Sequence, residues 1–244
     1  MTVSRPTQPT TQSGLAPGYE LFIVALSILS IGNVVIIFGP FEADTKSVAF
    51  IIDSCLSVFF MLDFLWRLRI AQSKRGYFID NQGWLDFLGS LPVPSFRLFR
   101  SVRVFKAIRR VRALGGRKVI RAIVRERAQS ALLLATFLVI VVMEFGSIFV
   151  VIAERGAPNA NITTGGDALW WAIVSVTTVG YGDKYPVTPA GRGIGALMLI
   201  SGVGLFGVFT GYVARVFLAP PESPEQEKVE EAIAAEVQEA LDDD

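Results

Sequence analysis

The chain has 244 residues, of which 52% are hydrophobic, and its 23 basic and 22 acidic residues leave a formal net charge of only +1. A mean hydropathy of +0.49 lies outside the range of ordinary soluble domains and predicts a polytopic membrane protein. The single cysteine, Cys55, excludes an intramolecular disulfide and a cysteine-based metal site.

The first 18 residues are rich in serine, threonine, proline and glutamine and lack the apolar core of a signal peptide. They predict a disordered cytoplasmic N-terminus. Two uncharged stretches, residues 21–41 and 193–214, are each long enough to cross about 30 Å of hydrocarbon as a helix. These two stretches therefore predict membrane spans.

Two more stretches, residues 48–65 and 132–153, have the length of a span but contain acids. Asp53 and Asp63 lie in the first stretch, and Glu144 lies in the second. Because a charge at membrane depth is costly, such residues indicate a function. The sequence suggests a role for both aspartates but leaves the role of Glu144 open.

Basic residues orient these spans through the positive-inside rule. One basic group follows residues 48–65 and another precedes residues 132–153, which predicts that both loops are cytoplasmic. The two groups are Arg67, Arg69, Lys74 and Arg75, and then Arg117, Lys118, Arg121, Arg125 and Arg127. The connections around residues 42–46 and 154–167 are then external. Residues 82–112 must leave the cytoplasm and return, which gives six spans with both termini inside.

Residues 97–112 hold seven basic residues and no acid, in a repeat of one basic and two apolar residues. The repeat places Arg97, Arg100, Arg103, Lys106 and Arg109 at every third position. Two simpler interpretations of this segment are a helix that lies on an anionic membrane surface and a face that binds nucleic acid. The strict triplet differs from the spacing of a surface helix, and nucleic-acid binding would need the basic face in water. On an α-helix, each basic residue of the repeat lies about 60° around the helix axis from the previous one, so the charges form a spiral. A spiral of charges suits a helix that rotates as it slides past fixed acids.

Acids on the neighbouring segments can serve as those fixed charges. Asp53 and Asp63 lie roughly 15 Å apart along a helix, and Phe60 comes one turn before Asp63. Asp86 follows the start of the third segment, at a depth that matches Asp63. For any one of these acids, the alternative interpretation is a static ion pair between two helices. Together with the basic repeat, a transfer path for cations is favoured, because buried acids and bases offset each other's cost.

The motifs FMLDFLWR and LDFLGSLP, together with the basic repeat, resemble the voltage-sensor domain of voltage-gated cation channels. The resemblance implies that the five repeat residues named above are gating charges. It also implies that Phe60, Asp63 and Asp86 form a charge-transfer centre and that Asp53 is the outer sensor acid. Residues 113–130 are similar to the linker that transmits sensor motion to the gate.

The stretch DALWWAIVSVTTVGYGDKYP, residues 167–186, predicts a capped helix that is too short to span, followed by a segment that is not helical. Asp167 is the predicted cap. The next segment alternates glycine with bulky residues, so successive carbonyls can face one axis: Thr178, Val179, Gly180, Tyr181 and Gly182. Non-helical backbone at membrane depth is tolerated where it lines a water-filled path. Four TVGYG loops form the filter of potassium channels, which predicts K+ binding by Thr178, Val179, Gly180 and Tyr181.

The resemblance to potassium channels implies further roles around this filter. Trp170 and Trp171 would brace the filter with Tyr181 as packing partner, although anchoring at the lipid interface is an alternative. Glu154 matches a glutamate that supports the outer pore. Gly202 falls at the gating hinge, and Tyr185 lies at the site of external quaternary ammonium block.

The predicted fold is an all-α membrane protein with six transmembrane helices, a re-entrant pore helix and a selectivity filter. The expected divisions are a tail at 1–18, a voltage sensor at 19–112, a linker at 113–130, a tetrameric pore domain at 131–218 and an acidic cytoplasmic tail at 219–244. The compact build is typical of prokaryotic members. No cofactor is expected beyond permeant K+, and the expected partners are membrane lipids and three further copies of the chain, with no nucleic acid and no obligate auxiliary subunit.

The predicted function is a voltage-gated, potassium-selective channel of the plasma membrane that opens on depolarisation. The alternative is a potassium channel with weak or hyperpolarisation-driven gating that behaves as a leak. An enzyme is not expected, because a sensor-coupled enzyme would need a cytoplasmic catalytic domain. A sodium or calcium channel would place acids where this chain has the filter glycines.

Overall fold

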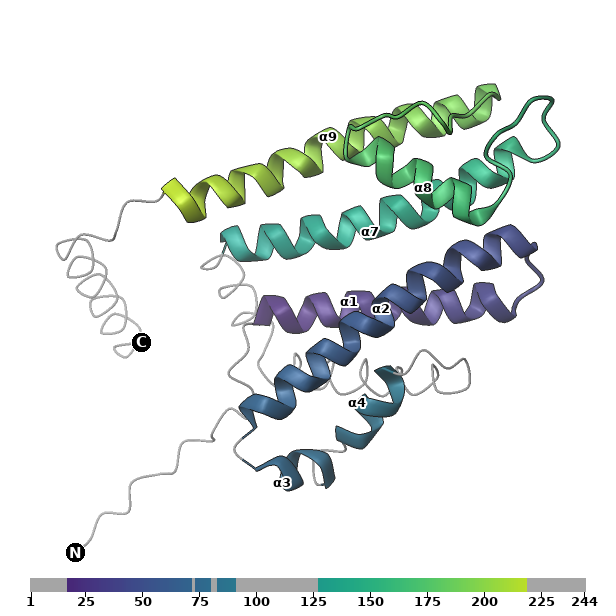
Figure 1. Ribbon diagram of the computed structural model, residues 1–244. Coiled ribbons are helices and arrows are strands. Elements are labelled where there is room, and N and C mark those ends of the chain that lie inside the picture. The colour runs from purple at the N-terminus through teal and green to yellow at the C-terminus, as the bar shows by residue number, and fades with distance from the viewer. Residues whose placement is uncertain (1–16, 72, 80–82, 91–126, 219–244) are drawn as a thin grey trace, which may run out of the picture. The chain divides into compact units, whose positions relative to one another are not determined.

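The computed structural model describes residues 17–71, 73–79, 83–90 and 127–218 (Figure 1). The basic repeat from Arg97 to Arg109 lies outside the described residues. So do most of the predicted N-terminal tail, nearly all of the linker and the acidic tail.

Helices make up the described segments apart from the connections between them. Their bounds are α1 Pro17–Phe38, α2 Ala43–Ile70, α3 Lys74–Ile79, α4 Gly83–Ser90, α7 Arg127–Glu154, α8 Gly165–Val176 and α9 Pro189–Leu218. Within this part of the chain, α1, α2, α7 and α9 are long and apolar enough to cross a membrane. They overlap the four spans predicted from hydropathy. The two further spans fall in residues 82–112, of which the structure describes α4, so the count of six stays a prediction.

Helices α1 and α2 form a hairpin that turns at residues 39–42 (Figure 1). One apolar core joins this hairpin to α7 and α8, and it includes Leu26 of α1, Phe60 of α2, Ile148 of α7 and Leu169 of α8. The predicted sensor hairpin and the predicted pore helices therefore share one core within a single chain.

The two connections predicted to be external lie on the same side of this core. Arg155, just after α7, forms an exposed ion pair with Glu42 of the α1–α2 turn at 3.5 Å. The first residue of α8, Gly165, lies against the carbonyl of Asp44 so closely that a Cβ atom would collide with it. The arrangement agrees with the common sidedness that the charge pattern predicted.

A second core joins α7, α8 and α9, and it contains Val150, Trp171 and Met198. Gly146 of α7 allows α9 to come close, because a Cβ atom there would overlap the side chain of Met198. The chain divides into two units between Phe209 and Thr210, inside α9. The second unit is described as the helical end of α9, residues 210–218.

Candidate functional site

The N-terminus of α8 is closed by a capping box. Thr164 is the N-cap residue, and its hydroxyl accepts a hydrogen bond from the Asp167 backbone N–H at 3.1 Å. The Asp167 carboxylate in turn accepts bonds from the backbone N–H groups of Thr163 and Thr164 at 3.2 and 3.1 Å. The prediction that Asp167 is itself the cap was wrong, because the helix begins two residues earlier, at Gly165, and Asp167 is its third residue.

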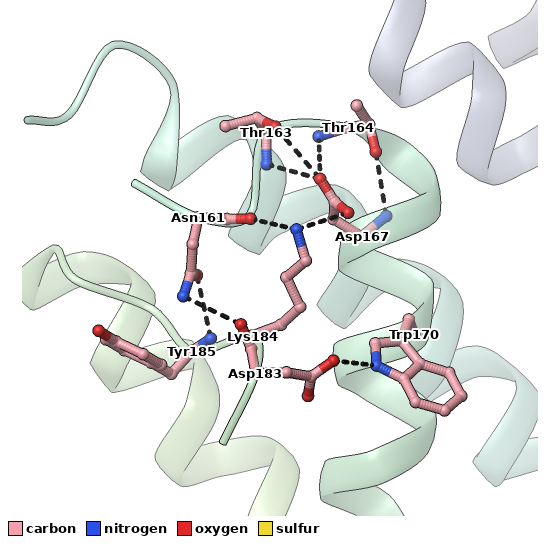
Figure 2. Close-up of polar contacts among 8 residues, drawn as sticks. All are labelled: Asn161, Thr163, Thr164, Asp167, Trp170, Asp183, Lys184 and Tyr185. Carbon is pink, nitrogen blue, oxygen red and sulfur yellow. Dashed lines mark hydrogen bonds and ion pairs between the residues drawn. The ribbon is translucent and has the colours of Figure 1, made fainter. Parts of the chain in front are cut away.

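The Asp167 network extends from this cap to the residues that follow the filter (Figure 2). Lys184 forms an ion pair with Asp167 at 2.8 Å and donates to the Asn161 carbonyl at 2.7 Å. The Asn161 side chain donates to the Asp183 carbonyl at 3.3 Å and accepts from the Tyr185 N–H at 3.1 Å. Residues 161–167 and 183–185 are therefore tied together on both sides of the filter segment.

The electrostatics of Asp167 follow from this setting. Partial burial alone would raise the pKa of the Asp167 carboxyl. The Lys184 ammonium and the hydrogen bonds from Thr163 and Thr164 outweigh the burial and lower that pKa to about 2. Asp167 is thus ionised at any physiological pH and can pair with Lys184 throughout that range.

The two tryptophans of α8 have different surroundings. Trp170 donates from Nε1 to the Asp183 carboxylate at 2.7 Å (Figure 2), and its ring stacks on that of Tyr181 with centroids 5.9 Å apart. Trp171 is buried in the second core, where its ring lies beside Gly195 of α9. The structure thus brings Trp170 and Tyr181 together, whereas Trp171 packs between helices.

The backbone after α8 alternates between two conformations. Thr178, Gly180 and Gly182 have positive φ angles of 60°, 61° and 79°, whereas Val179 and Tyr181 between them do not. A positive φ is natural for glycine but is an outlier for a β-branched residue such as Thr178. Such strain in a sparsely populated region is typical of functional sites.

Three backbone N–H groups of this segment turn back to the end of α8. The N–H of Thr178 donates to the Ser175 carbonyl at 3.0 Å, and those of Val179 and Gly180 donate to the Val174 carbonyl at 3.0 and 3.2 Å. The described peptide bonds are all trans, so each N–H points opposite to the carbonyl of the residue before it. The consecutive carbonyls of Thr177, Thr178 and Val179 therefore point away from α8, toward one side.

Glu154, the last residue of α7, is fully buried and clamps the segment before α9. Its carboxylate accepts hydrogen bonds from the backbone N–H groups of Val187 and Thr188, both at 2.9 Å, and from the Thr188 hydroxyl at 2.7 Å. Gly191 leaves the room that this carboxylate occupies. The clamp fixes the start of α9 relative to α7.

Gly202 and Tyr185 lie in contrasting places. Gly202 is buried within α9 against the backbone of Val176, where a Cβ atom would lie 2.9 Å from the Val176 carbonyl oxygen. Close packing on the end of α8 is thus a second reason for glycine at the predicted hinge.

Tyr185 is half exposed beside the filter segment, and its backbone N–H donates a hydrogen bond to the Asn161 side chain.

A second polar site lies between α1 and α2, and we name it the Arg67 cluster: Tyr19, Glu20, Asp63 and Arg67. Arg67 donates from Nε to both Asp63 oxygens at 2.9 and 3.0 Å and from Nη1 to Glu20 at 2.8 Å. The Tyr19 hydroxyl donates to Asp63 at 2.8 Å. Arg67, predicted to lie in the basic group that follows the second span, is in the last turn of α2, which continues to Ile70, and it is buried there.

The other predicted sensor residues are buried nearby. Phe60 is fully buried in the first core, and Asp86 is buried on α4, which packs on α2 through Phe64 and Phe87. Asp53 is fully buried and accepts a hydrogen bond from Ser30 of α1. Among the buried side chains described in α1, α2 and α4, four acids (Glu20, Asp53, Asp63 and Asp86) thus accompany one base, Arg67.

Several residues of these sites were not singled out from the sequence. For Arg67 the available signal was its position one turn after Asp63, the spacing of an ion pair on one helix. Glu20 and Tyr19 gave none, because their partners are 47 and 44 positions away. Asn161 and Lys184 join the filter region only through the folded loop.

Known proteins of one family are similar to this chain. Residues 16–217 match the family described as ion transport protein. The chain is 41% identical over 73 residues to a voltage-gated potassium channel of Aeropyrum pernix, covering 30% of this chain and 25% of that protein. It is 27% identical over 203 residues to the human voltage-gated potassium channel KCNC4, covering 72% of this chain and 32% of the relative.

A third relative is the human voltage-gated potassium channel regulatory subunit KCNG3, which is 28% identical over 128 residues, 51% of this chain and 29% of that protein. The matches span a quarter to a third of the length of these curated relatives. The resemblance inferred from the filter and sensor motifs is confirmed. The family match covers well over half of the chain, which therefore belongs to the ion transport protein family and resembles its voltage-gated potassium channels.

Proposed function

We propose that this protein is a potassium-selective channel of the plasma membrane that opens on depolarisation. It works as a homotetramer with both termini in the cytoplasm. The observation that carries the proposal is the anchored backbone after α8, where the N–H groups of Thr178, Val179 and Gly180 are all held by the end of that helix.

This anchoring supports K+ binding because it commits successive carbonyls to one direction. Four copies of the segment arranged around an axis would surround that axis with rings of carbonyl oxygens, which can replace the hydration shell of K+. The C-terminal end of α8, at Thr177, adds a partial negative charge that favours a cation nearby. Thr178 and Val179, whose carbonyls are directed by this anchoring, would supply sites together with the next two residues of the segment, Gly180 and Tyr181.

A tetramer is supported by the exposure of apolar residues around the filter. The Tyr181 side chain is 69% exposed and Ile200 of α9 is 72% exposed in the single chain. Large exposed apolar surfaces indicate contact with a partner or with lipid. Neighbouring copies would cover the filter side chains, and lipid would cover the outer faces of the spans.

Voltage sensing is supported by the acids buried in the predicted sensor helices. The four buried acids and one buried base described above would be costly in a membrane if nothing balanced them. The basic repeat supplies the opposite charge. Moving one charge through the field is worth about 2.3 kcal/mol per 100 mV, so three or four charges in each of four subunits suffice for steep gating.

The proposal is tested with the full chain reconstituted in liposomes loaded with K+ or with Na+. We expect voltage-driven efflux from K+-loaded liposomes and little from Na+-loaded ones. Arg100→Gln and Arg103→Gln should each flatten the dependence of efflux on voltage. Equal efflux of Na+ would contradict the filter, and an unchanged slope in both variants would remove these residues from the gating charges.

Block by external tetraethylammonium tests the proposed role of Tyr185. The half-exposed ring can hold a quaternary ammonium ion through a cation–π contact. Tyr185→Val should weaken the block. Block of equal strength in the variant would remove Tyr185 from the site.

A further inference from the structure

Two fully buried glutamates lie on α7, and they differ sharply in their partners. Glu154 accepts three hydrogen bonds from the segment before α9. Glu144 is equally buried, but within the described part of the chain neither of its carboxylate oxygens has a hydrogen-bond partner. A buried carboxyl without a partner calls for an explanation, because it has given up its contacts with water.

Asn33 of α1 shows the same pattern. Its side chain is 1% exposed, and both its amide nitrogen and its amide oxygen lack hydrogen-bond partners among the described residues. Asn33 continues a buried polar stripe of α1 in which Ser27 and Ser30 precede it at intervals of three residues. Ser27 bonds back to its own helix, and Ser30 bonds to Asp53 of α2. The stripe therefore faces the interior of the protein.

These two side chains meet at the junction of α1, α2 and α7. The Asn33 amide lies beside the Glu144 carboxyl, although the geometry falls short of a well-formed hydrogen bond, and Asp53 is close enough to act on Glu144 through its charge. A primary amide has two N–H donors and one carbonyl acceptor, so Asn33 can pair with Glu144 whether or not the carboxyl carries a proton.

We propose that Glu144 and Asn33 form a buried carboxyl–amide link through which the voltage-sensor hairpin α1–α2 acts directly on the first pore helix, α7. Glu144 is a positioning residue in this proposal, because it acts on the pore through α7. The link rests on the proposed voltage gating. It lies beside Asp53, the predicted outer sensor acid, so a cation that reaches or leaves Asp53 changes the field at Glu144.

The link provides a route that is separate from the linker at residues 113–130. A polar pair in an apolar core favours one arrangement of its helices, because sliding either helix separates the two polar groups and surrounds each with apolar side chains. A displacement of α1 or α2 would therefore strain α7 at Glu144, in the middle of the helix. From there α7 leads to Glu154 and its clamp on the start of α9.

A double-mutant cycle on the purified full-length tetramer tests the pair itself. Asn33→Leu and Glu144→Met nearly conserve side-chain size, and each should lower the unfolding temperature because it strands the other polar group. The double variant should recover much of the loss, because two apolar groups replace the pair. Losses that add in the double variant, or no loss in either single variant, would overturn the link. Glu144→Gln, which keeps a hydrogen-bonding group, is the conservative variant and should stay close to the wild type.

Planar bilayer recording tests the coupling, which a merely structural pair would not affect. The double variant, although stable, should open less in response to a given voltage step, with the ratio of open to closed channels changed by about tenfold. Ser27→Ala, which removes a buried hydroxyl that bonds to its own helix, should leave that ratio unchanged. A double variant that gates like the wild type would overturn the coupling. Wild-type channels that ignore voltage would instead contradict the proposed function, while the stability cycle would still decide the pair.

Discussion

The Asp167 network and the Arg67 cluster both hold acids against bases, but they balance charge differently. In the network, Asp167 faces Lys184 at 2.8 Å and Asp183 faces Trp170 at 2.7 Å, and these partners are no more than 17 positions apart. In the cluster, Arg67 serves both Asp63 and Glu20, on two helices. Acids outnumber bases among the buried sensor residues described.

The first site is held together by residues close in sequence, whereas the second depends on the packing of two helices. The network holds the filter segment from both sides and needs no further ion to balance Asp167. In the cluster, Asp63 and Glu20 depend together on the one described base, Arg67. Substitutions in the two sites and in the predicted filter segment should differ in their effects accordingly.

The largest effect is expected from Gly180→Ala in the filter. At a φ of 61°, a residue with a Cβ atom is strained by about 1–2 kcal/mol. The backbone of the variant would therefore rotate to a different φ to relieve this strain. We expect the preference for K+ over Na+ to be lost in reversal potentials. Gly166→Ala is the matched control, because Gly166 lies nearby in α8 without a positive φ and with room for a methyl group. Retained selectivity in Gly180→Ala would contradict the role of the backbone.

Among the changes measured by stability, Arg67→Met should have the largest effect. The change leaves Asp63 and Glu20 buried without their shared cation, a loss of about 3–5 kcal/mol for a buried pair. The free energy of unfolding, measured by detergent titration, checks this. Arg69→Met changes an exposed residue on the same helix and should cost less than about 0.5 kcal/mol. Equal losses in the two variants would show that Arg67 is not the centre of the cluster.

Trp170→Phe, in the Asp167 network, should lower the free energy of unfolding by less. The variant keeps a ring against Tyr181 but loses the hydrogen bond to the Asp183 carboxylate, at a cost of about 1.5 kcal/mol. Asp183→Asn in the same background should add little, because the bond is already absent. Trp66→Phe, at an exposed position of α2, is the control for loss of the indole. A full additional loss from Asp183→Asn would argue against the bond.

The smallest effect concerns pH. The pKa of Asp167 is about 2 in the folded protein and about 3.9 in an unfolded chain, so the ion pair with Lys184 stabilises the fold above about pH 4. That contribution, about 1 kcal/mol after solvent screening, should disappear as the pH falls from about 4 to 2. The stability difference between wild type and Asp167→Asn should follow this course. A difference that already shrinks between pH 7 and 5 would contradict the assigned pKa.

The backbone of the predicted filter segment could be anticipated from sequence because its requirement is local. The segment from Thr178 to Gly182 carries its own backbone requirement, and Trp170 and Glu154 flank it closely in the chain. The cap was misassigned by three residues because Thr164, Gly165 and Asp167 all suit a helix start, and only the backbone geometry distinguishes them.

The contacts of α1 and α2 were harder to predict because they join residues far apart in the sequence. Asp63 and Asp53 stood out as acids in apolar stretches, but their partners Tyr19 and Ser30 are common residues on α1. Glu144 could be given no role from sequence, because Asn33 and Asp53 come near it only when α1 and α2 pack on α7. The gating role of the basic repeat was inferred from the spacing of its charges and from the resemblance to voltage sensors, and it stays a prediction.

The most direct test of the account is single-channel recording from the purified chain in planar bilayers, with K+ on one side, Na+ on the other and stepped voltage. The account predicts currents that reverse near the potassium equilibrium potential and channels that open more often as the membrane is depolarised. Currents that reverse near zero, or an open probability that does not change with voltage, would contradict it.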